Sequence, residues 1–285
     1  MNKGNSMTTT NDTPLLSLQD LTVALPKGAD RAYAVENLSY DVLRGEILCV
    51  VGESGSGKSM AANAVMGLLP KGVRPVGGKA MFDGQDLLSI TEKQHRELRG
   101  LQIGMIFQEP MTALNPLMRV GAQISEVFEA HGQFNGSERG AKALELLKEV
   151  GLPDPEKAIR AYPFQLSGGQ RQRVMIAMAL ALEPELLIAD EPTTALDVTI
   201  QAQILDLLML LKQQDGMGML FITHDLGIVR QIADRVCVMQ DGKIVETGPT
   251  KDIFMAPQHP YTQKLLIAHS VGAPQPFDPS ASVIA

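Results

Sequence analysis

Short apolar runs alternate along the chain with longer stretches in which apolar residues recur at helical spacing. Three of these runs are GEILCVVG at 45–52, PELLIADEP at 184–192 and GMLFITHD at 218–225. Strands buried on both faces of a parallel sheet have continuous apolar sequences, and charged residues at their carboxyl ends often carry chemistry. The pattern therefore predicts an α/β protein with a mainly parallel sheet.

Helical periodicity fills the segments between these strands. A helix is expected to begin near Lys58 and to run through MAANAVMGLL, and a second one spans ERGAKALELLKEVGL at 138–152, with Gly151 as its C-cap. Residues 109–165 contain no comparable apolar strand. We expect them to form a helical subdomain inserted in the α/β core.

The sequence near the end of the chain predicts a β-hairpin, and the composition of the two ends predicts tails. ADRVCVMQ and KIVETG flank Asp241-Gly242, a dipeptide typical of tight β-turns. Residues 1–13 and 269–285 are polar or rich in Pro, Ser and Ala, which predicts flexible tails around one domain at 14–268. The sequence shows no internal repeat.

Composition narrows the class of protein further. The 285 residues are 45% hydrophobic and 20% charged, which is typical of a globular protein. A net charge of −7, 4% aromatic residues and the absence of Trp argue against nucleic acid as a partner. Cys49 and Cys237 lie in apolar runs, so we expect buried thiols rather than a disulfide framework or a four-cysteine metal site.

Membrane-spanning and export signals are also lacking. The polar start of the chain does not resemble a signal peptide. The longest apolar run, VMIAMALAL at 174–182, is about half the roughly 20 residues that cross a bilayer. We therefore expect a cytosolic protein that reaches a membrane only through a protein partner.

The first candidate site is the sequence GESGSGKS, which fits the phosphate-binding pattern G-x-x-x-x-G-K-[ST] between a predicted strand and a predicted helix. Its glycines allow a tight loop whose N–H groups point inward at phosphate, and the helix N-terminus adds partial positive charge. We expect Lys58 to reach the β- and γ-phosphates of a nucleotide and Ser59 to bind Mg²⁺. The nucleotide-binding residues are Gly52, Glu53, Ser54, Gly55, Ser56, Gly57, Lys58 and Ser59.

A phosphate loop needs a metal-binding carboxylate at a neighbouring strand end. LLIAD ends in Asp190, which we expect to hold Mg²⁺, and Glu191 follows it as the candidate general base for the attacking water. Alone, LLIADE could be any buried strand that reaches the surface. The phosphate loop makes the catalytic interpretation the stronger one.

A second candidate anion site lies at the start of another predicted helix. It is the sequence LSGGQ, formed by Leu166, Ser167, Gly168, Gly169 and Gln170. A serine hydroxyl and exposed backbone donors at a helix N-terminus can bind phosphate, although the same residues can also form an ordinary N-cap. Two such sites in one chain suggest that a phosphate is held from two sides.

These motifs together resemble the ATP-binding cassette (ABC) ATPases over about residues 14–268. GESGSGKS, Gln108 in IFQEP, LSGGQ, LLIADEP, Asp197 in TALD and His224 in FITHD occur in the family's order. The resemblance implies a RecA-like P-loop NTPase core with an N-terminal antiparallel β part and an inserted helical subdomain. It also implies ATP and Mg²⁺ as cofactors.

The resemblance further implies a role for each motif. Each ATP would lie between the phosphate loop of one subunit and the LSGGQ of a second ABC ATPase subunit, with Asp197 crossing the interface. Gln108 would sense Mg²⁺ and the γ-phosphate, and His224 would contact the γ-phosphate beside Glu191. Lys58, Glu191 and His224 are the expected catalytic residues, and Ser59, Gln108 and Asp190 the expected metal ligands.

Longer strings resemble the ATPase subunits of bacterial oligopeptide, dipeptide and nickel importers. The most telling is HPYTQKLL at 259–266, which lies outside the shared core and could equally be a capped helix packed on the body. The resemblance implies a peripheral protein on the cytoplasmic face of the inner membrane, bound to two permease subunits and served by an extracytoplasmic binding protein. Non-transport ABC ATPases and exporters are the alternatives.

Two departures from the family leave details open. An aromatic residue for adenine stacking is not at its usual place, where Leu25 stands, and Tyr33 is the alternative. The C-terminal segment has no cysteine cluster, so no iron–sulfur centre is expected there.

Overall fold

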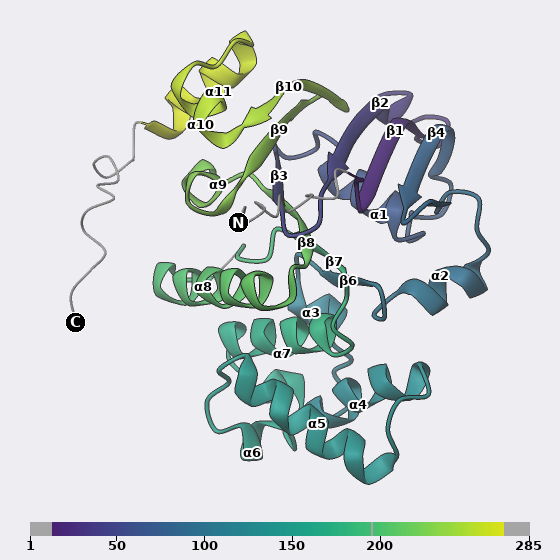
Figure 1. Cartoon of the computed structure of the whole chain (residues 1–285), viewed down its shortest axis with the longest axis vertical. Helices are drawn as coiled ribbons and strands as arrows, with labels where there is room; N and C mark the ends of the chain where they lie inside the picture. The colour runs from purple at the N-terminus through teal and green to yellow at the C-terminus, as the bar shows by residue number, and fades with distance from the viewer. Residues whose placement is uncertain (1–12, 195, 271–285) are drawn as a thin grey trace, which may run out of the picture.

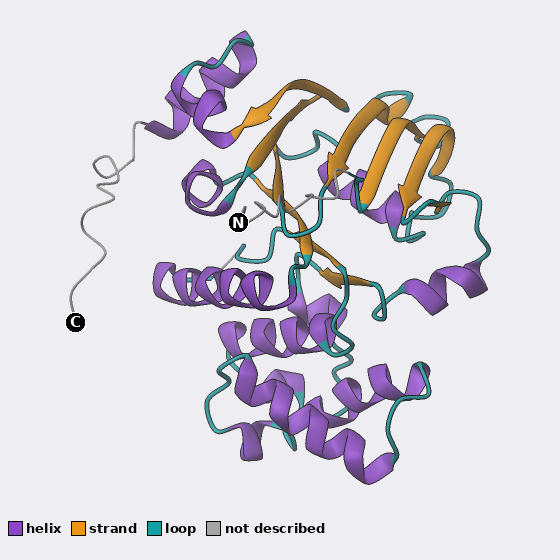
Figure 2. Cartoon of the chain, in the orientation of Figure 1, coloured by secondary structure: helices purple, strands orange, loops and turns teal. Residues whose placement is uncertain are grey.

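The computed structural model describes residues 13–194 and 196–270, and two β-sheets organise them (Figures 1 and 2). The smaller sheet is antiparallel, in the order β2-β1-β4-β5. The larger has the order β10-β9-β3-β8-β7-β6 and is parallel except for β10 at its edge. The strands are β1 (Leu16–Ala24), β2 (Tyr33–Val42), β3 (Ile47–Val51), β4 (Arg74–Phe82), β5 (Gln85–Asp86), β6 (Ile103–Ile106), β7 (Leu186–Asp190), β8 (Gly218–Thr223), β9 (Arg235–Gln240) and β10 (Lys243–Pro249).

The three apolar runs form β3, β7 and β8 at the centre of the larger sheet, and every residue of these strands is buried. Their side chains alternate between two cores. One core joins the larger sheet to α1 (Lys58–Val65) and the smaller sheet. The other joins the opposite face to the later helices, among them α7 (Gly168–Leu180), α8 (Val198–Asp215) and α9 (Leu226–Ile232). The α/β fold class is thus confirmed.

Helix α1 ends earlier than its apolar pattern predicts. Gly67 adopts a left-handed φ of 63°, which favours glycine and stops the helix. The amide of Gly67 donates to Ala64 O, and that of Leu68 to Asn63 O at 2.8 Å. These two bonds form a Schellman cap, so the predicted extension to Leu69 is wrong.

The described residues between 109 and 165 contain helices and no strand. Figure 1 shows α4, α5 and α6 gathered at the end of the molecule away from the smaller sheet. Helix α5 ends at Glu149 with Val150 as its C-cap, and Gly151, the predicted C-cap, is the next residue and has a φ of 63°. The remaining helices are α2 (Glu92–Leu98), α3 (Pro110–Ala113), α4 (Val120–Ala130), α5 (Gly136–Glu149), α6 (Pro155–Ala158), the 3-10 turn η1 (Pro163–Gln165), α10 (Thr250–Met255) and α11 (Pro260–Ser270).

Two smaller predictions are also confirmed. Asp241 and Gly242 form the turn between β9 and β10, both with positive φ. Cys49 and Cys237 are fully buried free thiols on neighbouring strands, and burial raises the pKa of both. The predicted tails fall almost entirely in 1–12 and 271–285, outside the described residues. Among the described helices, none is long and apolar enough to cross a membrane.

Candidate nucleotide-binding site

The predicted site residues converge at the carboxyl edge of the larger sheet. Residues 52–57 form the loop between β3 and α1, and Lys58 and Ser59 are the first two residues of α1. Asp190 is the last residue of β7, and His224 follows the last residue of β8. Because β3, β8 and β7 are adjacent and parallel, all three ends open on one side, where ligands of α/β sheets usually bind.

The backbone of the phosphate loop requires glycine at Gly57. Its φ is +103°, a conformation that residues with a Cβ rarely adopt. A Cβ at this position would also collide with the carbonyl oxygen of Ala34 on β2. The loop is therefore packed tightly against the smaller sheet directly before α1 begins.

Lys58 is held inside the loop. Its side chain is buried and its Nζ donates to Gly52 O at 2.8 Å and Glu53 O at 3.0 Å. Burial lowers the pKa of Lys58, while Glu191 and Asp190 oppose that shift. A desolvated ammonium of this kind binds an anionic phosphate more strongly than a solvated one does.

Ser59 and Asp190 meet beside Lys58, as predicted. Ser59 Oγ donates to Asp190 Oδ1 at 2.9 Å. Burial raises the pKa of Asp190, and the neighbouring Glu191 adds to this shift. Mg²⁺ is commonly bound by one or two protein oxygens together with phosphate oxygens. This hydroxyl and this carboxylate fit such an ion, although no cluster of three or more His, Cys, Asp and Glu suited to a metal occurs in 13–194 and 196–270.

Glu191 is the point where three other side chains meet. Its Oε2 accepts from Gln108 Nε2 at 3.1 Å and from Thr194 Oγ1 at 2.9 Å, and His224 Nδ1 lies 3.3 Å away. The φ of Glu191 is +46°, and its N–H donates to Ile222 O on β8. The residues predicted as base, sensor and γ-phosphate ligand are therefore brought together.

Sequence reasoning missed two contributors to this region. Thr194 holds the Glu191 carboxylate, and its only signal was a hydroxyl three residues after a candidate base. Arg31 Nη2 donates to Gly55 O at 2.5 Å from the loop between β1 and β2. No local motif marks Arg31, because only the fold brings it to the phosphate loop.

A cavity of about 240 Å³ lies against the phosphate loop. Lys58, Ser59, Gln108 and Glu191 line it together with Leu25, Arg31, Ala34, Ser54, Gly55, Gly57 and Met60. Tyr33, which the sequence left open as an adenine-stacking residue, does not line this cavity, whereas Leu25 does.

The LSGGQ residues lie outside that cavity and form the start of α7. Ser167 caps the helix, because its Oγ accepts from Gln170 N at 3.3 Å and its own N–H donates to Gln170 Oε1 at 2.9 Å. A Cβ on Gly169 would lie 2.8 Å from Ile200 on α8. Asp197 caps α8 by accepting from Ile200 N at 2.9 Å. The N-cap role is thus present, and the role toward a second subunit stays a prediction.

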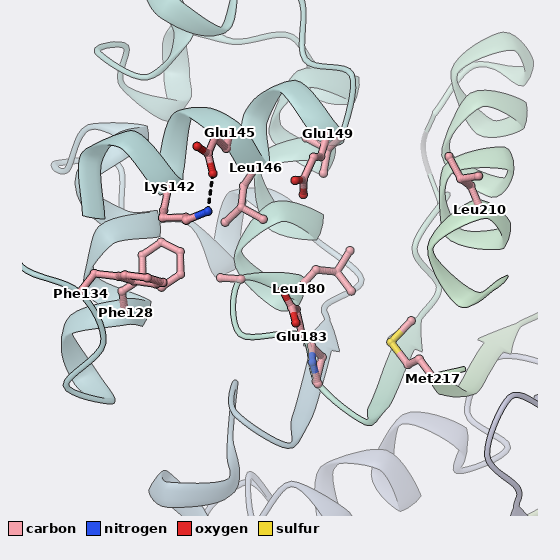
Figure 3. A pocket seen from close by; sticks show the side chains of 13 residues that line it. Phe128, Phe134, Lys142, Glu145, Leu146, Glu149, Leu180, Glu183, Leu210 and Met217 are labelled. Carbon is pink, nitrogen blue, oxygen red and sulfur yellow. Dashed lines mark hydrogen bonds and ion pairs between the residues drawn. The ribbon is translucent and has the colours of Figure 1, made fainter. Parts of the chain in front are cut away.

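A cavity of about 560 Å³ lies elsewhere, between the helical region and α8 (Figure 3). Apolar side chains such as Phe128, Leu180 and Leu210 line it beside three glutamates. The Lys142 ammonium at its rim is paired with Glu145 at 2.6 Å. None of the predicted site residues lines this cavity, so it is not the nucleotide site.

A phosphate loop between a buried strand and a helix, with a carboxylate and a candidate base at the end of a second strand of the same sheet, defines the chain as a P-loop nucleotide-binding cassette. The family model described as ABC transporter matches residues 35–194. A second, described as Oligopeptide/dipeptide transporter, C-terminal region, matches residues 245–275. The chain belongs to the ABC transporter family, in agreement with the sequence resemblance.

Curated relatives agree with this assignment. The chain is 57% identical to the Peptidoglycan transport ATP-binding protein YejF of Agrobacterium fabrum over 98% of its own length, but it spans only 51% of that protein. It is 52% identical to the Dipeptide transport ATP-binding protein DppD of Escherichia coli, over 89% of this chain and 78% of that protein. The Oligopeptide transport ATP-binding protein OppD of Bacillus subtilis is 50% identical, over 89% and 71%.

Solved structures show the same fold. A dimeric post-hydrolysis state of the ATP-binding cassette MJ0796 bound to ADP and Pi matches with a TM-score of 0.74 and 31% identity, over 82% of this chain and 98% of that chain. CbiO1 of Clostridium perfringens, part of an ABC transporter complex, matches with a TM-score of 0.71 and 28% identity, over 85% and 91%.

Proposed function

We propose that this chain is the ATP-hydrolysing, energy-coupling subunit of a membrane ABC importer for peptides. The observation that carries this proposal is the convergence on Glu191, where Gln108, Thr194 and His224 surround one candidate base next to the buried Lys58. The match to the oligopeptide/dipeptide transporter C-terminal region supports the class of cargo.

The chemistry of the proposed reaction follows from these side chains. Lys58 would stabilise charge on the β- and γ-phosphates, while Glu191 accepts a proton from the attacking water. His224, next to Glu191, would donate a hydrogen bond to the γ-phosphate. Ser59, Asp190 and Gln108 would hold Mg²⁺, which when bound neutralises phosphate charge.

A second ABC ATPase subunit completes the proposed site. Ser167, Gly168 and Gly169 lie at the N-terminus of α7, and the cavity that contains Lys58 lacks all three. We place them against ATP held by another chain, with Leu166 and Gln170 fixing the turn and Asp197 at the interface. The dimeric MJ0796 cassette bound to ADP and Pi supports this arrangement.

Two permease subunits are the proposed membrane partners. A cavity of about 610 Å³ is lined by Phe107, the residue before Gln108, and by other apolar side chains that include Leu68, Leu114, Val127 and Met175. Leu68 and Phe107 are exposed there although they are large and apolar. We place a permease segment in this cavity. Gln108 would couple the position of that segment to the presence of the nucleotide. The chain would then sit peripherally on the cytoplasmic face of the inner membrane, and an extracytoplasmic binding protein would deliver the cargo.

We assign the motor to residues 14–268, with 109–165 as the part that meets the permease. Peptides released from peptidoglycan are a second candidate cargo, favoured by the 57% identity to the peptidoglycan transport protein. Nickel import remains an alternative that uses the same ATPase chemistry.

Substitution of Lys58 tests the phosphate site. The Lys58→Ala variant removes the buried ammonium, and ATP affinity should fall at least about 100-fold, because the loss of a buried charge contact costs several kcal/mol. Isothermal titration calorimetry with MgATP measures this effect. Lys142→Ala is the matched control, since that lysine pairs with Glu145 far from the loop. Equal ATP binding by Lys58→Ala and the wild type would refute the proposal.

A further inference from the structure

Helix α11 near the C-terminus reaches the outer side of the phosphate loop. The N–H of Glu53 donates to the hydroxyl of Tyr261 at 3.2 Å, across 208 positions of sequence. The ring of Tyr261 also packs against the core that contains Leu265. A residue of the peptide-transporter C-terminal region thus contacts the nucleotide loop directly.

The start of α11 is fixed in place by β10. The carboxylate of Glu246 accepts from the backbone N–H groups of Gln258 at 2.8 Å and His259 at 3.0 Å. His259 Nδ1 in turn accepts from the N–H of Tyr261 at 3.2 Å. A series of hydrogen bonds therefore connects the larger sheet to the phosphate loop through the start of α11. These bonds fix the position of Tyr261 relative to the loop.

Three backbone groups of the loop each form a hydrogen bond with a different distant segment. Ser56 O accepts from Gly242 N at 2.9 Å, and Gly55 O accepts from Arg31. The third group is the N–H of Glu53, which donates a hydrogen bond to the Tyr261 hydroxyl. A loop whose outer groups are fixed loses less conformational entropy when phosphate orders its inner amides. The Tyr261 contact holds the first turn of the loop.

We infer that Tyr261 is a positioning residue for the nucleotide, whose hydroxyl holds the Glu53 amide and with it the phosphate-binding form of the loop. The inference rests on the proposed function, since the loop must bind ATP. Coupling is reciprocal, so bound ATP should also stabilise the docking of α11.

The Tyr261→Phe variant isolates the hydroxyl, because it keeps the ring that packs on the core. One hydrogen bond of this kind corresponds to about a three- to tenfold change in an equilibrium constant. We expect the Kd for MgATP to rise by that factor in calorimetry on the full chain. Lys264→Ala, an exposed position on the same helix, should leave the Kd unchanged.

Hydrogen–deuterium exchange provides a readout that does not need ATP. In Tyr261→Phe without nucleotide, peptides covering 52–59 should exchange faster than in the wild type. In the wild type, MgATP should slow exchange in α11, and the variant should lose most of this effect.

The two measurements separate the two proposals. If the wild type binds ATP and Tyr261→Phe matches it in both affinity and loop exchange, the positioning role is refuted. If the wild type binds no ATP, the proposed function fails. Unchanged loop exchange would then also overturn the inference, because the loop would not depend on the hydroxyl.

Discussion

The two candidate anion-binding helix N-termini of this chain are built differently. At α1, Ser56, Lys58 and Asp190 are buried, and partners from distant segments brace the loop. At α7, Ser167 is exposed and its capping partner, Gln170, comes from the same motif. The residues of the first half of the proposed site all lie within one chain. The second half is an exposed helix end that a ligand held by another chain can approach.

Replacing Glu191 should have the largest effect of the substitutions considered, and this effect is on the rate of ATP hydrolysis. Glu191→Gln keeps the shape of the side chain but removes the base, so hydrolysis should fall by about 10²- to 10⁴-fold. ATP binding should persist, because Lys58 and the loop are unchanged. Phosphate release under saturating ATP, alongside calorimetric binding, measures both effects.

A matched control for this prediction lies at the opposite end of β7. Glu185 precedes β7 and pairs with Arg44 at the surface, so Glu185→Gln should hydrolyse ATP like the wild type. Normal turnover by Glu191→Gln would show that another group acts as the base.

Replacing Ser167 tests the exposed half. Ser167→Ala removes the cap of α7 and should lower the free energy of unfolding by about 1 kcal/mol. ATP binding to a single chain should not change, whereas hydrolysis by the paired motor should fall by about tenfold or more, because a donor to the facing phosphate is lost. Urea unfolding, calorimetry and ATPase assays separate these effects.

One outcome would contradict the proposal that the N-terminus of α7 contacts ATP held by a facing subunit. If Ser167→Ala weakens ATP binding by one isolated chain as strongly as it slows hydrolysis, the two helix ends act within one molecule. A serine elsewhere at a helix, Ser137 in the first turn of α5, supplies the control substitution to alanine.

The smallest expected effect concerns the pH dependence of stability. Burial raises the pKa of Asp190, so the ionised carboxylate destabilises the folded state above that pKa. This cost disappears as the pH falls below the unfolded-state value of about 3.9. With EDTA present, Asp190→Asn should therefore have a higher Tm than the wild type at pH 7, and the difference should shrink toward pH 4. A difference that grows on acidification would contradict the burial argument.

Local motifs predicted much of the site because its chemistry follows strand ends. Apolar runs followed by polar residues predict the strand that ends at Asp190, the phosphate-binding motif at 52–59 and the position of His224 after β8. The same reasoning extended α1 to Leu69, since a hydrophobic pattern does not indicate whether Gly67 turns left-handed. It missed Thr194 because a hydroxyl near an acid is common in loops.

The order of apolar and polar residues predicted the α/β class, the glycines of GESGSGKS predicted a turn that can hold phosphate, and the resemblance of several motifs to known ATPases indicated the family. These depend on short stretches of sequence, in which periodicity and backbone freedom act locally. Only the tertiary structure decided that Arg31 and Tyr261 brace the phosphate loop. It also decided that LSGGQ lies outside the cavity containing Lys58. Such contacts join residues far apart along the chain, and they depend on how the two sheets and the last helix pack together.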